Sequence, residues 1–325
     1  MKVYQVVLKL AVSTFCLLGL LICEVRVEAQ QDFPPEIALR PGLIFHPTQN
    51  IAYVMRPGGI AAIDLSSGGT QWTSNAAAKP LALAGNLLVA QVEPRLANRL
   101  ELAVLDVQQR GTPTVRSTFD LPTDVKVSIG ESIDGKFLVH AQPSGSEAVV
   151  TWAFEPKQRR DIEQESDRVQ LRARTPYPRR GGFRMDLATG RQTTTPDAAA
   201  VQLPPSPRWI LAATQKIRDA APTQYESADG RHILASELVA DDRVFEKYRW
   251  SVFERASGQR VGEFRTHVSF TPFVVRGDSL FYETTPYIRA GKSEPAKLRG
   301  VNLRTGREAW GVEVRENVYR GPLPP

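Results

Sequence analysis

The residues that could bind a metal or carry out acid–base chemistry are few and scattered along this 325-residue chain. Its four histidines, His46, His140, His232 and His267, have neither the His-x-His nor the His-x-x-x-His spacing that places two imidazoles on one metal ion. Three of them, His140, His232 and His267, lie in strand-like sequence, which indicates ordinary sheet residues. Folding could still bring histidines together, so the spacing disfavours a metal site without excluding one.

Nucleophilic catalysis finds no support in the sequence either. Cys16 and Cys23 both lie in an apolar N-terminal stretch, so the rest of the chain has no thiolate for disulfides, zinc binding or nucleophilic attack. The Gly-x-Ser-x-Gly, P-loop and Gly-x-Gly-x-x-Gly motifs are absent, and residues 143–147 (PSGSE) predict a polar loop. We therefore predict no catalytic, cofactor-binding or metal-binding residue.

A basic segment from Lys157 to Arg184 is the most unusual stretch of charge, with nine Lys and Arg residues against four Asp and Glu residues. It predicts an insertion whose cations contact an acidic partner, lipid headgroups or another polyanion, and a solvated insertion between strands is the alternative. The residues assigned to an acidic partner are Lys157, Arg159, Arg160, Arg179 and Arg180.

The first thirty residues read as a secretory signal peptide. Lys2 and Lys9 precede the apolar run 10–23, which at about 14 residues is too short to span a bilayer, and short side chains at Val27 and Ala29 predict cleavage after Ala29. An uncleaved membrane anchor is the alternative. Since no Asn-x-Ser/Thr sequon is present, we expect an exported bacterial protein, periplasmic or secreted. Export in turn argues against nucleic acid as its normal ligand.

Five copies of one short pattern provide the framework for these residues. In each copy an apolar residue precedes an acidic or amide residue, which we call the anchor, and in four copies Ser or Thr and then Gly follow three and four places later. Such a side chain caps its own turn, and Gly supplies the positive φ of a tight hairpin. In the second copy Gly111 comes one place late, after Arg110, which predicts a longer or bulged turn. The anchors are Asp64, Asp106, Asp186, Glu254 and Asn302.

Each anchor has a short strand-like run upstream, so a unit reads strand, turn, strand, turn, strand. The anchors are 42, 80, 68 and 48 residues apart, which suits blades of about 40–45 residues with insertions. Trp72 and Trp310 both follow their anchors by eight residues and fall in the returning strand. The upstream runs are 50–54, 85–89, 134–139, 229–234 and 277–282.

These units resemble the PQQ-like, quinoprotein-type repeats of β-propellers, which are related to WD40-type blades. The best copies run from Ile60 to Trp72 and from Leu298 to Trp310, and the resemblance covers about residues 40–316. It implies an all-β fold: a β-propeller of four-stranded antiparallel blades, with five clear repeats and five to seven blades in all. An antiparallel sandwich with several such hairpins is the alternative.

The resemblance does not bring the chemistry of the quinoprotein dehydrogenases with it. In those enzymes PQQ lies between a Trp and a vicinal disulfide and is held through calcium by acidic and amide side chains. This chain has no cysteine beyond Cys23, and Asp64, Asp106 and Asp186 are interpreted as turn caps rather than calcium ligands.

The sequence thus predicts a signal peptide over residues 1–29 and a single propeller domain over 30–325, with a basic insertion at about 157–182. Its predicted function is that of an exported, non-catalytic module that binds or scaffolds another protein or peptide on a propeller face, similar to PQQ-like repeat proteins of the bacterial envelope. The alternative is an enzyme that uses the propeller axis, either a hydrolase or lactonase or a quinone-dependent oxidoreductase.

Overall fold

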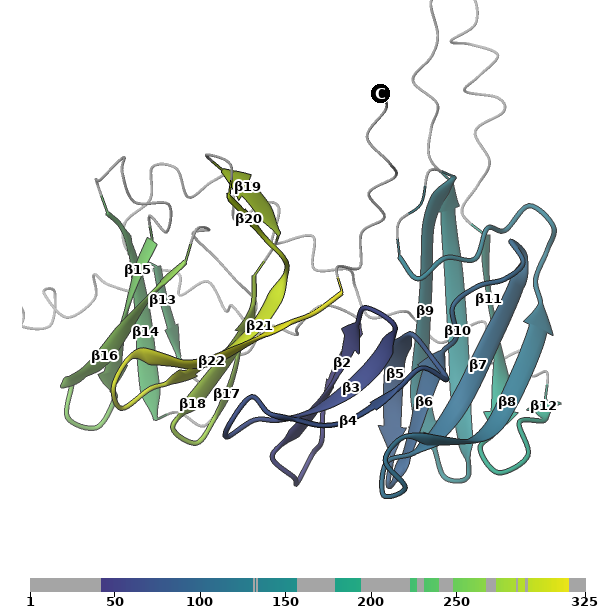
Figure 1. Cartoon of the computed structure of the whole chain (residues 1–325), viewed down its shortest axis with the longest axis horizontal. Helices are drawn as coiled ribbons and strands as arrows, with labels where there is room; N and C mark the ends of the chain where they lie inside the picture. Colours follow the sequence, from purple (N-terminus) through teal and green to yellow (C-terminus); the bar gives the residue numbers. More distant parts are fainter. Residues whose placement is uncertain are drawn as a thin grey trace, which may run out of the picture. The chain divides into compact units, whose positions relative to one another are not determined.

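The computed structural model describes residues 42–130, 132, 134–156, 179–193, 223–226, 231–239, 248–266, 273–284, 286–289 and 292–315. Within these ranges the regular structure is entirely β, with five four-stranded sheets and one two-stranded hairpin (Figure 1). The predicted signal peptide lies outside the described residues, as does most of the predicted basic insertion.

Each four-stranded sheet is built from strands that follow one another in sequence. Sheet 1 contains β1 (Leu43–Phe45), β2 (Ile51–Arg56), β3 (Gly59–Asp64) and β4 (Thr70–Ser74). Sheet 2 contains β5 (Lys79–Ala84), β6 (Leu87–Gln91), β7 (Arg99–Asp106) and β8 (Thr112–Asp120). Sheet 3 contains β9 (Gly135–Ser144), β10 (Glu147–Pro156), β11 (Arg179–Asp186) and β12 (Gln192–Thr193).

The last two sheets repeat this order. Sheet 4 contains β13 (Thr223–Glu226), β14 (His232–Leu238), β15 (Tyr248–Glu254) and β16 (Arg260–Thr266). Sheet 5 contains β17 (Phe273–Arg276), β18 (Ser279–Glu283), β21 (Lys297–Asn302) and β22 (Arg307–Glu313), and the hairpin of β19 (Tyr287–Arg289) and β20 (Lys292–Glu294) lies between its second and third strands. All pairs are antiparallel, so each sheet is a four-stranded meander, the unit of a β-propeller blade.

Burial within a sheet falls from the middle strands to the last strand. The central residues of β2, β3 and β10 are buried without alternation, whereas most residues of β4 and β22 are partly or fully exposed. A strand with apolar side chains buried on both faces must pack between two neighbouring sheets. The sequence pattern of these strands therefore requires sheets stacked face to face, as in a propeller.

All five third strands end at their anchor residue, as the sequence predicts. The glycine that closes each turn has a φ between 64° and 75°, and its N–H donates to the anchor's carbonyl at 2.8–2.9 Å. In four copies the anchor side chain caps the turn by accepting from the N–H groups two and three residues on. These pairs are Asp64 with Ser66 and Ser67, Asp106 with Gln108 and Gln109, Asp186 with Ala188 and Thr189, and Asn302 with Arg304 and Thr305.

The turn glycines also join neighbouring sheets. A Cβ at Gly68 of sheet 1 would lie 2.6 Å from the ring of Trp310 in sheet 5, and a Cβ at Gly111 of sheet 2 would lie 2.5 Å from Trp72 in sheet 1. Trp310 donates its Nε1 hydrogen to the carbonyl of Leu65 at 3.1 Å. Only a glycine leaves room for an indole at this distance. Trp72 and Trp310, each eight residues after an anchor, therefore pack against the turn of another sheet.

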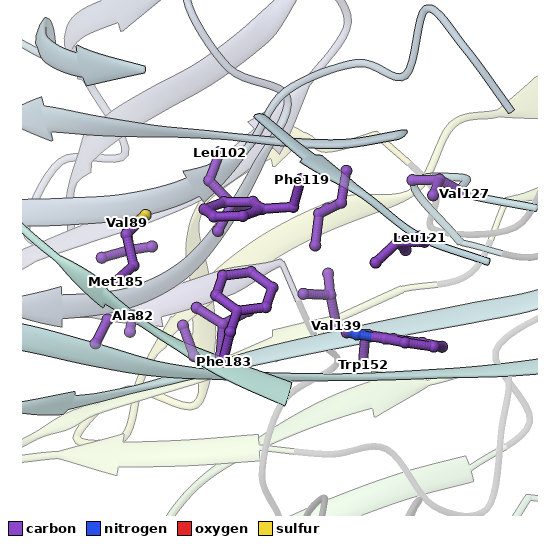
Figure 2. Packing of buried hydrophobic residues seen from close by; sticks show 14 of the residues in the cluster. Ala82, Val89, Leu102, Phe119, Leu121, Val127, Val139, Trp152, Phe183 and Met185 are labelled. Atoms are coloured by element: carbon purple, nitrogen blue, oxygen red, sulfur yellow. The ribbon is translucent and has the colours of Figure 1, made fainter. Parts of the chain in front are cut away.

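Four hydrophobic clusters connect the sheets in pairs: sheets 1 and 2, 2 and 3, 4 and 5, and 5 and 1. The cluster between sheets 2 and 3 is the largest, and in it the rings of Phe119 and Phe183 stack with centroids 4.0 Å apart (Figure 2). The cluster between sheets 5 and 1 includes Phe281 and Trp310, whose centroids are 5.8 Å apart. The C-terminal sheet of the described chain therefore packs on the N-terminal one.

Sheet 3 departs from the strand assignment that the sequence suggests. The upstream run at 134–139 is the start of β9, the first strand of its sheet, whereas the runs at 50–54 and 85–89 fall on second strands. The second strand of sheet 3 is β10, which the repeat does not mark. The predicted basic insertion at 157–182 overlaps β11 at its last four residues, because residues 179–182 pair with β10.

Candidate functional site

The two ends of each sheet differ in how their strands are connected. At one end, which we call the anchor end, lie the turns between first and second and between third and fourth strands. A repeated hydrogen bond joins these two turns in all five sheets: the N–H after the anchor donates to the first turn at 2.7–2.9 Å. The donors and acceptors are Leu65 and Asn50, Val107 and Asn86, Leu187 and Ser146, Arg255 and Arg231, and Leu303 and Asp278.

The opposite end, the loop end, carries the connections between second and third strands. These are residues 57–58, 92–98, 157–178, 239–247 and 284–296, so their lengths are 2, 7, 22, 9 and 13 residues. Surface connections of variable length on a rigid scaffold are where binding functions concentrate. The loop end is therefore the candidate binding surface, whereas the anchor-end turns are short, at 2–5 residues, and are joined by the same hydrogen bond in every sheet.

A buried polar pair secures the loop end of sheet 2. Lys79 and Gln91 face each other across β5 and β6, and both are fully buried. Lys79 Nζ donates to the carbonyl of Ile129 at 3.2 Å, and Gln91 Nε2 donates to the carbonyl of Ser128 at 3.0 Å. They thus hold the connection from β8 to β9 through two consecutive carbonyls. Burial, followed by the nearby charge of Lys136, lowers the pKa of Lys79 to about 8.

A second link at the loop end comes from the residues after β22. Arg315 donates its N–H to the carbonyl of Met55 at 2.9 Å, and its guanidinium binds both carboxylate oxygens of Glu93 at 2.5 and 3.0 Å. This bidentate pair raises the pKa of Arg315, chiefly through the hydrogen bonds to Glu93. Arg315, which follows the last strand of sheet 5, is thereby tied to sheets 1 and 2 together.

The basic residues predicted to meet an acidic partner are divided by the structure. Lys157, Arg159 and Arg160 lie outside the described residues. Arg179 and Arg180 are the first two residues of β11, where both are exposed, and Arg179 Nε donates to the carboxylate of Asp124 at 2.6 Å. These two arginines therefore lie at the base of the 22-residue connection.

Three of the four histidines fall within the described residues, and none of them joins a metal-binding cluster. His140 is in β9 and His232 in β14, as predicted, whereas His46 caps a turn by accepting from the N–H groups of Thr48 and Gln49. Burial, and then the charge of Arg276, lowers the pKa of His46. In the part of the chain that the structure describes, no three His, Cys, Asp or Glu side chains gather closely enough to hold a metal ion.

The described residues lack the vicinal disulfide of the quinoprotein dehydrogenases, and the three aspartates considered as calcium ligands cap turns. The described residues contain no cysteine. One carboxylate oxygen of each of Asp64, Asp106 and Asp186 accepts hydrogen bonds from backbone N–H groups of the residue's own turn. Burial raises the pKa of Asp64, but the hydrogen bonds within its turn together outweigh this effect and lower the pKa. Hydrogen bonds from Thr189 lower the pKa of Asp186. These aspartates are therefore turn caps within blades.

Two groups of residues at or near the loop end were not predicted from the sequence. The first is the Lys79 and Gln91 pair, whose only signal is that each interrupts an otherwise apolar run. The second is a set of arginines in a cleft at the outer edge of sheets 1 and 2, described below. Their grouping depends on how two sheets pack, which no local pattern encodes.

Five meander sheets joined through repeated turn contacts define the chain as a β-propeller protein, and this assignment rests on the sheets themselves. No family model matches the chain, and no curated protein matches it. Among the described residues there is no helix long and apolar enough to cross a membrane.

Solved structures to which the chain is similar include two enzymes and one β-propeller domain. One is a europium-containing methanol dehydrogenase, at 11% identity over 85% of this chain and 69% of that one, with a TM-score of 0.25. Another is the hydrazine synthase of Kuenenia stuttgartiensis, at 12% identity over 84% of this chain and 66% of that one, with a TM-score of 0.25. A third is the β-propeller domain of the Trilobed protease from Pyrococcus furiosus, at 12% identity over 71% of this chain and 55% of that one, with a TM-score of 0.19.

Proposed function

We propose that the chain is an exported, non-catalytic β-propeller of the PQQ-like repeat type that binds another protein or peptide at its loop end. The observation that carries this proposal is the contrast between the two ends of the sheets. At the anchor end four of the five turns that follow an anchor share one geometry and the fifth is one residue longer, whereas at the loop end the connections between second and third strands range from 2 to 22 residues. The much larger length variation at the loop end favours a recognition surface there.

The packing of Trp310 and Trp72 against turn glycines supports the assignment to PQQ-like repeats. In both contacts the indole lies against the glycine of a neighbouring repeat, so the tryptophan and the glycine serve one inter-blade contact. The repeat would then supply the scaffold alone, because the described residues contain no cysteine for the vicinal disulfide that lies against PQQ in the dehydrogenases.

The partner would be acidic where it meets the basic connection. Residues 157–178 carry six Lys and Arg against four Asp and Glu, and Arg179 and Arg180 add two exposed cations at the point where this segment enters β11. Clustered cations on a surface connection attract acidic partners and increase the rate of encounter at low ionic strength.

The binding surface can be tested by shortening this connection. Because Phe154 pairs with Arg179, replacing residues 157–178 by Asn-Gly should leave β10 and β11 as a closed hairpin. The control is the insertion of three residues between Gly145 and Ser146, in the turn at the anchor end. Each variant would be expressed in its native envelope, cross-linked and purified. We expect one partner to be captured by the wild type and the control but not by the shortened variant.

Two outcomes would count against this proposal. Capture of the same partner by the shortened variant would move the binding surface elsewhere. A large thermal shift of the purified chain with calcium and PQQ would instead favour an enzyme that uses the propeller axis. Export is tested separately by N-terminal sequencing of the envelope protein, for which we expect Gln30 as the first residue, whereas Met1 would indicate an uncleaved anchor.

A further inference from the structure

A basic cleft of about 910 Å³ lies at the outer edge of sheets 1 and 2. Arg56 enters it from the end of β2, Arg110 from the turn between β7 and β8, and Arg116 from β8. The acidic residue in its lining is Glu313, at the end of β22. Three guanidinium groups face two carboxylates, Glu313 in the lining and Glu101 in a salt bridge with Arg116, so the cleft keeps an excess of one positive charge. Its volume suits several side chains of a ligand.

Two of these arginines are held in place by the sheets. Arg116 donates to Glu101 Oε1 at 3.0 Å and to the carbonyl of Ala76 at 3.1 Å, and Arg56 donates to Thr70 Oγ1 at 3.2 Å. Each of these contacts uses only some of the five N–H groups of a guanidinium. Both arginines thus remain able to donate to a ligand, from positions that are already fixed.

Arg110 is the residue that sets this cleft apart from the other blades. The turn of sheet 2 is one residue longer than the turns of the other four copies, and Arg110 occupies the added position with a φ of 56°. It is the one residue other than glycine with a positive φ in the part of the chain that the structure describes. That conformation is unfavourable for a residue with a Cβ, and such positions concentrate at functional sites.

The cleft also borders an open edge of a sheet. Thr73 and Ser74 of β4 line it, and among the strands that the structure describes β4 pairs only with β3, which makes it an edge strand of sheet 1. An extended peptide can add its backbone to such an edge while alternate side chains point into an adjacent groove.

We infer that this cleft binds an extended acidic peptide, with carboxylates paired to Arg56, Arg110 and Arg116 and the peptide backbone along β4. The cleft includes residues 57–58, the shortest connection of the loop end, so it borders that surface, but none of its three arginines belongs to the basic connection at 157–178. Carboxylates suit the cleft because a guanidinium donates two parallel hydrogen bonds to one carboxylate.

The test measures fluorescence anisotropy of the whole chain with a labelled ten-residue peptide of alternating Glu and Val at 50 mM NaCl. The decisive variant is Arg110→Gly, because glycine accepts the positive φ and should leave the turn intact. We expect it to weaken binding about tenfold, as for the loss of one charge-assisted hydrogen bond, with a melting temperature equal to or above that of the wild type. Arg304→Gln, an exposed arginine on the corresponding turn of sheet 5, should bind like the wild type.

Four results would overturn the inference. Equal binding by Arg110→Gly and Arg304→Gln would place the ligand elsewhere, as would equal binding of a peptide with Gln in place of Glu. Tighter binding of a single-stranded oligonucleotide, lost in the same variant, would identify a polyanion site instead. Loss of peptide binding on shortening residues 157–178 would assign the peptide to the basic connection.

Discussion

Alanine at Gly68 would test how the last sheet of the described chain is joined to the first. Gly68 has a φ of 71°, and an added Cβ would lie 2.6 Å from the ring of Trp310, whereas ordinary contacts begin near 3.4 Å. The indole would have to move by about 0.8 Å, which would strain its hydrogen bond to Leu65.

The magnitude follows from separate contributions. Placing alanine at a positive φ costs about 1–2 kcal/mol, overpacking a well-filled contact costs about 1–3 kcal/mol, and weakening one buried hydrogen bond costs about 0.5–1.5 kcal/mol. We therefore expect Gly68→Ala to lower the free energy of unfolding by about 3–5 kcal/mol.

Gly258 provides the matched control. It occupies the same turn position in sheet 4 with a φ of 66°, and no described atom lies within 4 Å of an added Cβ. Gly258→Ala should carry only the backbone cost of about 1–2 kcal/mol. Urea denaturation followed by tryptophan fluorescence gives both values, and equal destabilisation by the two variants would refute the packing of Trp310 on Gly68 as a joint between sheets.

Two further predictions concern buried polar groups and turn caps. Because the pKa of Lys79 is about 8 in the folded chain against 10.5 ordinarily, urea denaturation should show stability rising by up to about 3 kcal/mol from pH 8 towards pH 10. Lys79→Met should abolish that rise. Burial raises the pKa of Tyr53 to about 12, so above pH 10 the stability of the wild type should fall again as the phenol of the unfolded chain ionises. Asp64→Asn should keep the turn, as Asn302 does in sheet 5, whereas Asp64→Ala should cost about 1 kcal/mol by the same measurement.

The turns were predictable from sequence because their chemistry is local. An anchor oxygen reaches N–H groups two and three residues away, and a glycine four residues away closes the hairpin, so no distant part of the chain is needed. Even the departure of the second copy could be read, since the late Gly111 requires the longer turn in which Arg110 adopts a positive φ.

Features that depend on the packing of distant segments could not be predicted. The strand β10 has a continuous buried run from Ala148 to Phe154 and carries no turn signal, so only its pairing with β9 and β11 identifies it. Trp310 was visible as an aromatic residue at a repeated spacing, but its acceptor, Leu65, is 245 residues away in the sequence. A repeat reveals the unit, whereas contacts between units follow from the fold.

Comparison of the five copies separates what the fold needs from what it does not. Four copies close the turn with glycine four residues after the anchor, so the extra residue in the second copy is not required to form a blade. That residue, Arg110, adopts a conformation that glycine would adopt more easily, and it lines a cleft with two other arginines. A fold under selection for stability alone would favour glycine there. If Arg110 binds the acidic peptide inferred above, replacing it by glycine should change stability and affinity in opposite directions.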